Sequence, residues 1–180
     1  PRAPDGVIRV VQVGDVNRNK NALATAEACE LLLEEGERVA LKIIGRPLDK
    51  RILRRLNACP FVEVLPPMPQ GELVLQYRES DVFVMPSRYE TFGLVYAEAM
   101  SQGLPVVYTR GQGFDGFFRD GEVGRAVKGG EIREIASSIK ECYERRAEML
   151  ATCIRAAGTF DWNSISDCYC QLYSAARCEA

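Results

Sequence analysis

The chain has 180 residues, of which 47% are hydrophobic and 27% charged, and its net charge is -2. These values are ordinary for a globular protein and leave room for one domain with a full core. The near-neutral charge gives no attraction for nucleic acid or anionic membranes. No apolar run approaches the ~20 residues of a membrane span. Residues 1–4 lead directly into a predicted strand without a signal peptide, so we expect a cytoplasmic protein.

The cysteine and histidine counts argue against a metal site. Seven cysteines are present, no two of them stand in a Cys-x-x-Cys pair, and the sequence contains no histidine. Common zinc patterns are therefore excluded or poor. We expect reduced thiols that are largely buried or half-buried.

Strand and helix patterns alternate along the chain. The predicted elements are a strand at 7–13, a helix at 20–35, a strand at 39–44, a helix at 48–57, a strand at 61–65, a helix at 71–79, a strand at 81–85, a helix at 92–102, strands at 105–108 and 124–127, and a helix from 132. On the helix at 20–35, Leu23, Ala26, Cys29 and Leu33 are predicted to share the buried face. Asp161 is the predicted N-cap of a last helix, whose apolar face comprises Ile165, Cys168, Tyr169, Leu172, Tyr173 and Ala176.

This alternation with short connections predicts an α/β fold: a Rossmann-like, doubly wound parallel sheet of about six strands flanked by helices. We see no linker or repeat, so residues 1–180 are expected to form one domain. Ligands of such sheets bind at the carboxyl ends of the strands. The loops expected there are 14–20, 45–48, 66–70, 86–91 and 109–116.

The segment at 81–107 is the most informative part of the chain. Its strand is stopped by Pro86, a short polar loop carries Glu90, and a helix opens at Phe92-Gly93. The first turn of a helix has free N–H groups that bind anions. Glu98, about two turns further along, can hold hydroxyl groups of the same ligand. A nucleotide sugar has both phosphate and sugar hydroxyls.

This segment resembles the donor-binding motif of the group 1 glycosyltransferases, which are retaining enzymes of the GT-B fold. Glutamate spacing alone is not specific, since Glu27 and Glu35 are also eight positions apart. The full context of the motif is what carries the resemblance, and it comprises Pro86, Ser87, Glu90, Phe92, Gly93, Glu98, Ala99, Gly103, Pro105 and Val106. The Asp-x-Asp metal motif of the other main glycosyltransferase fold is absent.

The resemblance implies roles for individual residues. Glu90 would lie by the donor sugar, Glu98 would bind the ribose hydroxyls, and the backbone of Thr91, Phe92, Gly93 and Leu94 would meet the phosphates. Lys20 stands six positions after Gly14, as does a phosphate-binding lysine of the family. Glu90 and Lys20 are thus the predicted catalytic residues.

Three positions depart from the family pattern or leave it open. Asp15 stands where the family usually has arginine, so either Arg18 takes over this role or Lys20 acts alone. The 45–47 turn lacks the second glycine of the family's Gly-x-Gly-Pro, and main chain near 66–68 would recognise the base. The loop at 111–116 is either a flexible glycine-rich turn or a feature shared with bacterial surface-polysaccharide transferases.

We therefore expect the donor-binding domain of a retaining, metal-independent glycosyltransferase without cofactor, which transfers a hexosyl unit from a UDP- or GDP-sugar. Expected partners are a nucleotide sugar, an amino-terminal acceptor domain of the same protein and a glycan or lipid-linked acceptor. Any contact with the membrane is expected through the acceptor domain, and no nucleic acid is expected as a partner. One alternative is a non-catalytic nucleotide-sugar-binding module that meets a separate acceptor subunit. Another is a flavodoxin-like scaffold without sugar chemistry.

Overall fold

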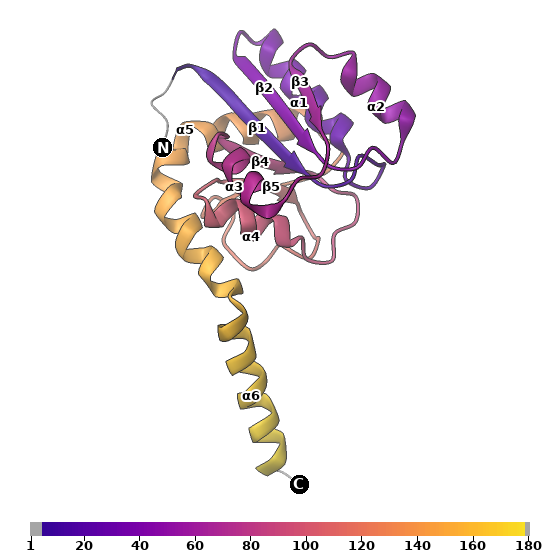
Figure 1. The fold of residues 1–180 in the computed structure, drawn as a ribbon. Helices are drawn as coiled ribbons and strands as arrows, with labels where there is room; N and C mark the ends of the chain where they lie inside the picture. The colour runs from indigo at the N-terminus through magenta and orange to yellow at the C-terminus, as the bar shows by residue number, and fades with distance from the viewer. Residues whose placement is uncertain (1–4, 179–180) are drawn as a thin grey trace.

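The computed structural model describes residues 5–178, except for the side chains of Ser164 and of residues 175–178. Six strands form one parallel sheet with helices on both faces (Figure 1), which confirms the predicted fold class. The strands are β1 (Val7–Val13), β2 (Arg38–Ile44), β3 (Val62–Leu65), β4 (Val82–Met85), β5 (Val106–Thr109) and β6 (Gly124–Val127). The helices are α1 (Ala22–Glu34), α2 (Lys50–Asn57), α3 (Gln70–Arg78), α4 (Leu94–Ser101), α5 (Ile132–Ala157), the short η1 (Gly158–Phe160) and α6 (Trp162–Cys178).

The strand order is β3-β2-β1-β4-β5-β6, and every pairing is parallel. The order reverses between β1 and β4, which are neighbours in the sheet although two strands separate them in sequence. Ligands of doubly wound sheets bind at such a reversal point, beside the carboxyl ends of the strands. The loops after β1 and β4 are therefore brought side by side by the topology.

Two hydrophobic cores lie on opposite faces of the sheet. Along β4, Val82 and Val84 point to one core and Phe83 and Met85 to the other, as the period of two in a strand requires. Residues of α1, α2 and the first half of α5 contribute to the first core. Residues of α3, α4 and the second half of α5 contribute to the second.

Three helices begin two residues later than predicted, and in two of them the cause is a left-handed residue. α1 begins at Ala22 because Asn21 has a left-handed backbone with φ 54°, and α4 begins at Leu94 because Gly93 has φ 82°. A left-handed residue cannot continue into a right-handed helix. Lys20 and Phe92 consequently lie in the loops that precede these helices. The third, α2, begins at Lys50 because Asp49 is its N-cap and accepts from the Arg51 and Ile52 N–H groups.

The buried face of α1 also differs from the prediction. Ala26 and Cys29 are buried as expected, but Leu23 and Leu33 are only partly buried. Small residues such as Ala24 and Ala28 fill the interior instead, since α1 packs against both the sheet and α5. Close packing of two backbones favours small side chains.

The last helix projects away from the sheet as an extension of α5 (Figure 1). Its N-cap prediction is confirmed, since the Asn163 N–H donates to the Asp161 carboxylate at 3.1 Å. The apolar face predicted for it is not buried: Tyr169, Leu172 and Tyr173 are 55%, 65% and 68% exposed. The side chain of Ala176 lies outside the described residues.

The cysteines follow the prediction only in part. Cys29, Cys142 and Cys153 are buried and Cys59 is half-buried, but Cys168 and Cys170 are exposed on α6. Burial raises the pKa of the Cys142 and Cys153 thiols to about 12, so both are inert at neutral pH. The side chain of Cys178 is not described. Within residues 5–178, no helix combines the length and apolar composition needed to cross a bilayer.

The left-handed start of α1 yields a stability prediction. The Asn21 side chain donates to the carbonyls of Pro86 and Gly129, and asparagine tolerates its backbone conformation. We expect Asn21→Ala to lower the free energy of unfolding by about 2 kcal/mol, through lost hydrogen bonds and left-handed strain. Urea denaturation measures this loss.

Asn57→Ala serves as the matched control, because Asn57 is exposed on the last turn of α2. It should change the free energy of unfolding by no more than about 0.5 kcal/mol. Equal effects of the two substitutions would contradict the role given to Asn21.

Candidate functional site

The loop after β1 and the loop after β4 are joined through Asn19. The Asn19 side chain donates to the Tyr89 carbonyl at 2.9 Å and accepts from the Tyr89 N–H at 2.9 Å. The Arg88 N–H also donates to the Asn19 carbonyl at 2.8 Å. These three hydrogen bonds fix the segment that leads to Glu90 against the segment that carries Lys20.

Lys20 and Glu90 form an ion pair across this junction. Lys20 Nζ lies 2.6 Å from Glu90 Oε2, and the two side chains are 22% and 10% exposed. The Lys20 stem crosses Gly14, where an added Cβ would stand 3.4 Å from two of its carbons. The structure thus brings together Gly14, Lys20 and Glu90.

The start of α4 adjoins this ion pair. The N–H groups of Thr91, Phe92 and Gly93 find no acceptor anywhere in residues 5–178. The Leu94 N–H lies in the first turn of α4, where a backbone N–H has no acceptor within the helix. Gly93 cannot carry a side chain here, since a Cβ would stand 2.5 Å from the Tyr96 ring. Free N–H groups at the positive end of a helix form an anion site.

Glu98 is oriented by a residue that the sequence analysis did not identify. The Tyr77 hydroxyl, on α3, donates to Glu98 Oε2 at 3.1 Å. Burial, with the neighbouring Glu98 charge, raises the pKa of Tyr77 far above its usual range, so the phenol stays a hydrogen-bond donor. The Glu98 carboxylate is therefore half-buried and held in one orientation, whereas a glutamate on an exposed helix face would rotate freely.

A small cavity of about 230 Å³ lies between the ends of β1 and β2. The two strand ends approach closely, since a Cβ on Gly45 would stand 2.1 Å from the Gly14 carbonyl oxygen. Pro67 and Met68, from the segment predicted to meet the base, line the cavity. The predicted base segment and Gly14 therefore line the same cavity.

Asp15 and Arg46 form an ion pair at the edge of this cavity. The Arg46 guanidinium donates to both carboxylate oxygens of Asp15, at 3.0 and 2.8 Å. These hydrogen bonds hold the pKa of Asp15 below its usual range. The turn at 45–47 lacks the second glycine of the family pattern, but it carries Arg46. The Arg46 guanidinium therefore lies beside Asp15, the residue that replaces the arginine usual in the family.

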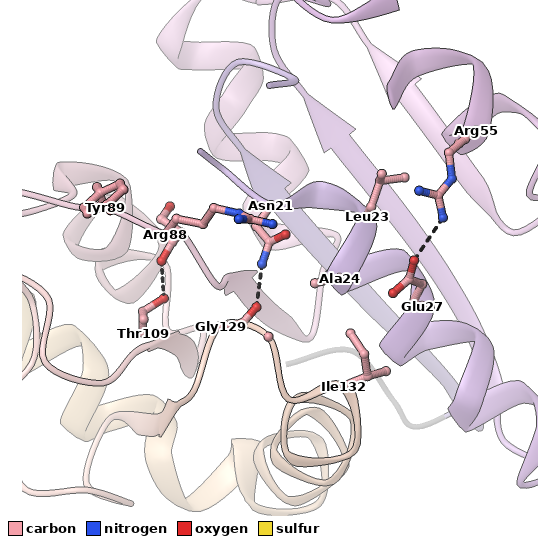
Figure 2. Close-up of a pocket in the computed structure, with 12 residues that line it drawn as sticks. Asn21, Leu23, Ala24, Glu27, Arg55, Arg88, Tyr89, Thr109, Gly129 and Ile132 are labelled. Carbon is pink, nitrogen blue, oxygen red and sulfur yellow. Dashed lines mark hydrogen bonds and ion pairs between the residues drawn. The ribbon is translucent and has the colours of Figure 1, made fainter. Parts of the chain in front are cut away.

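Arg18 does not join the other predicted residues. It lines a separate cleft of about 520 Å³, together with Arg51, Arg55 and Arg88. An adjoining cleft is drawn in Figure 2, where Arg88 reaches over the start of α1 and Arg55 pairs with Glu27. A phosphate role for Arg18 stays a prediction that this geometry does not support.

Sequence reasoning missed Asn19, Tyr77 and Gln112, which contact the predicted residues through long-range hydrogen bonds. Asn19 adjoins Lys20, and Gln112 lies in the loop at 111–116, so both lie in segments that the sequence already marks as candidates for the site. Nothing in the pattern of α3 singles out Tyr77. Among the described residues, no group of three or more acidic, cysteine or histidine side chains is placed to hold a metal ion.

The chain matches known glycosyltransferases. The family described as Glycosyl transferases group 1 matches residues 1–159. Curated relatives include D-inositol 3-phosphate glycosyltransferases from Thermomonospora curvata, 33% identical over 78% of this chain and 36% of the relative, and from Acidothermus cellulolyticus, 35% identical over 77% and 34%. That of Geodermatophilus obscurus is 30% identical over 97% and 41%. The chain thus spans less than half the length of these relatives.

Solved structures share the fold. The pneumococcal O-GlcNAc transferase GtfA, in complex with UDP and GlcNAc, superimposes with a TM-score of 0.79 at 19% identity over 93% of this chain and 35% of its own. Anabaena Alr3699/HepE, in complex with UDP and glucose, superimposes with a TM-score of 0.75 at 22% identity over 94% and 48%. At these identities the likeness establishes the fold, which is that of the carboxyl-terminal half of a GT-B protein.

The start of α4 should tolerate no side chain at Gly93. We expect Gly93→Ala to lower the free energy of unfolding by about 1–3 kcal/mol, because alanine is strained at this backbone conformation and its Cβ meets the Tyr96 ring. Thermal or urea denaturation measures the loss.

Gly71→Ala is the matched control, since Gly71 lies within α3 and an added Cβ meets nothing there. Alanine should leave stability unchanged or raise it by up to about 1 kcal/mol. A stable Gly93→Ala protein would show that the α4 N-terminus does not need its glycine.

Proposed function

Because the chain belongs to the group 1 glycosyltransferases, we propose that it forms the donor-binding domain of a retaining, metal-independent enzyme. The complete protein would transfer a hexosyl unit from a UDP- or GDP-sugar to its acceptor. An amino-terminal domain would bind the acceptor, and this chain alone would bind donor without transferring it. The observation that carries the proposal is the Lys20–Glu90 contact beside the N–H groups of residues 91–93, which lead into α4 and have no acceptor among residues 5–178.

The donor diphosphate is proposed to bind at the start of α4. The N–H groups of Thr91, Phe92 and Gly93 supply hydrogen-bond donors, and Lys20 supplies the positive charge. Both would stabilise negative charge as the sugar–phosphate bond breaks and the diphosphate leaves. Fixed donors of this kind lower a barrier because they need no reorganisation during the reaction.

Glu90 is proposed to contact the donor sugar. Its carboxylate is held at Lys20, so the sugar and the diphosphate would be bound by neighbouring groups of one site. Glu90 would then lie near the bond that breaks, and we propose it, with Lys20, as a catalytic residue. Transfer with retention is part of the proposal and is supported by the family resemblance.

The nucleoside half of the donor is proposed to bind at Glu98 and at the cavity lined by Pro67 and Met68. Tyr77 holds the Glu98 carboxylate in a fixed orientation, which favours hydrogen bonds to two adjacent ribose hydroxyls. The two structural neighbours were both solved with UDP. We therefore favour a uridine nucleotide over a guanosine nucleotide.

Two acceptors are proposed, one from the resemblance noted in the sequence and one from the relatives. A glycan or lipid-linked acceptor of bacterial surface polysaccharide synthesis, reached at the inner face of the membrane, is one candidate. The relatives named for D-inositol 3-phosphate make a phosphorylated cyclitol the second. An assay of the complete protein with both acceptor classes separates the two.

Calorimetric titration with UDP, GDP and ADP tests the donor site. We expect saturable binding of UDP, and at least tenfold weaker binding by Glu98→Ala, because one or two hydrogen bonds to a charged group are lost. Glu35→Ala is the control, since Glu35 is exposed at the end of α1 and belongs to the Glu27–Glu35 pair of the same spacing. It should bind UDP as the unsubstituted protein does.

Two results would contradict the assignment. Equal affinities for Glu98→Ala and the unsubstituted protein would remove Glu98 from the site. No binding of any of the three nucleotides by the complete protein would refute the donor-binding function.

A further inference from the structure

The loop at 111–116 is the one feature of the sequence motifs that the proposed function leaves without a role. It follows β5 and lies against the segment that carries Glu90. We propose that Gln112 is a positioning residue, which sets recognition of the donor sugar by fixing the backbone of Glu90. This inference rests on the proposed function, since it concerns the same donor site.

Gln112 and Gly113 satisfy both backbone groups of Glu90. The Glu90 N–H donates to Gln112 Oε1 at 3.0 Å, and the Gly113 N–H donates to the Glu90 carbonyl at 2.9 Å. Two consecutive residues of the loop after β5 thereby hold Glu90, which lies in the loop after β4. The Glu90 N–H is consequently engaged, whereas the N–H groups of the next three residues have no acceptor among residues 5–178.

The peptide unit between Tyr89 and Glu90 is held from both ends. Its carbonyl, which belongs to Tyr89, accepts from the Asn19 side-chain amide, and its N–H, which belongs to Glu90, donates to the Gln112 side-chain amide. A peptide unit is planar, so two hydrogen bonds in opposite directions fix its orientation. The direction in which the Glu90 side chain leaves the backbone is fixed with it.

The loop is built to hold Gln112 in place. Asp115 closes it on itself by accepting from the Gly111 N–H at 2.7 Å, and the Asp115 N–H donates to the Gln112 carbonyl at 2.8 Å. Phe114 anchors the loop in the core, being 2% exposed and 4.8 Å, centroid to centroid, from the Tyr96 ring. These contacts argue against a flexible turn.

Gly113 lets the loop approach closely enough for the contact. A Cβ at this position would stand 1.6 Å from the Thr91 carbonyl oxygen and 2.9 Å from the Phe92 nitrogen. Backbone therefore packs directly on backbone beside the free N–H groups of α4. Any side chain at Gly113 would push the loop away and separate the Gln112 amide from Glu90.

The experiment compares UDP with UDP-glucose and UDP-N-acetylglucosamine, titrated calorimetrically into the complete protein. Gln112→Met preserves the length of the side chain but removes the acceptor. We expect it to weaken binding of the sugar nucleotide that the protein prefers by about tenfold, the worth of one hydrogen bond, while UDP affinity changes by less than about twofold. Gln112→Ala, which also lacks the acceptor, should give the same pattern.

A double substitution separates positioning from general stability. If Gln112 acts through Glu90, adding Gln112→Met to Glu90→Ala should cause no further loss of sugar-nucleotide affinity. Gln102→Met is the matched control, because it removes an amide acceptor for Arg78 just beyond the far end of α4. It should leave both affinities unchanged.

Each other result overturns the inference in a recognisable way. Equal weakening of UDP and sugar-nucleotide binding by Gln112→Met, or a further loss in the Glu90→Ala background, would make Gln112 a residue of general stability. Unchanged sugar-nucleotide affinity would remove its role while leaving the donor site intact. Failure of the unsubstituted protein to bind UDP would instead refute the proposed function itself.

Discussion

The peptide unit between Tyr89 and Glu90 is the point on which the rest of the candidate site depends. Asn19, in the loop after β1, and Gln112, in the loop after β5, both form hydrogen bonds with this peptide unit, which lies in the loop after β4. The three loops are therefore linked to one another by hydrogen bonds. This is possible because β1, β4 and β5 are neighbours in a parallel sheet and all three loops leave the same edge. The strand order thus determines the geometry of Glu90 before any ligand arrives.

The ion pair between Lys20 and Glu90 lies where a donor diphosphate is proposed to bind. Its two side chains are 22% and 10% exposed, so water screens their attraction only in part. A diphosphate carries more charge than a carboxylate and would compete with Glu90 for Lys20. In the free protein the pair keeps both side chains extended toward each other, which reduces the conformational entropy that binding would remove.

The sheet and the glutamates could be predicted from the sequence, whereas the contacts that orient them could not. Alternating apolar runs predict a parallel sheet, and the motif around Glu90 and Glu98 points to one edge of it. Tyr77 and Gln112 are held to these glutamates by tertiary hydrogen bonds, which leave no periodic signal. The start of α1 differs from the prediction because the left-handed conformation of Asn21 is not visible in composition.

The departure at Asp15 changes how an anion would be held. Its carboxylate takes up the Arg46 guanidinium, and Arg18 faces another cleft, so Lys20 is the one cation paired with Glu90 among residues 5–178. Phosphate binding would then depend mainly on backbone N–H groups. The N–H groups of Thr91, Phe92 and Gly93 have no acceptor among residues 5–178, and Gly113 allows the backbone of the 111–116 loop to pack beside them. The proposed anion site therefore depends on the two glycines, Gly93 and Gly113, as well as on the single cation Lys20.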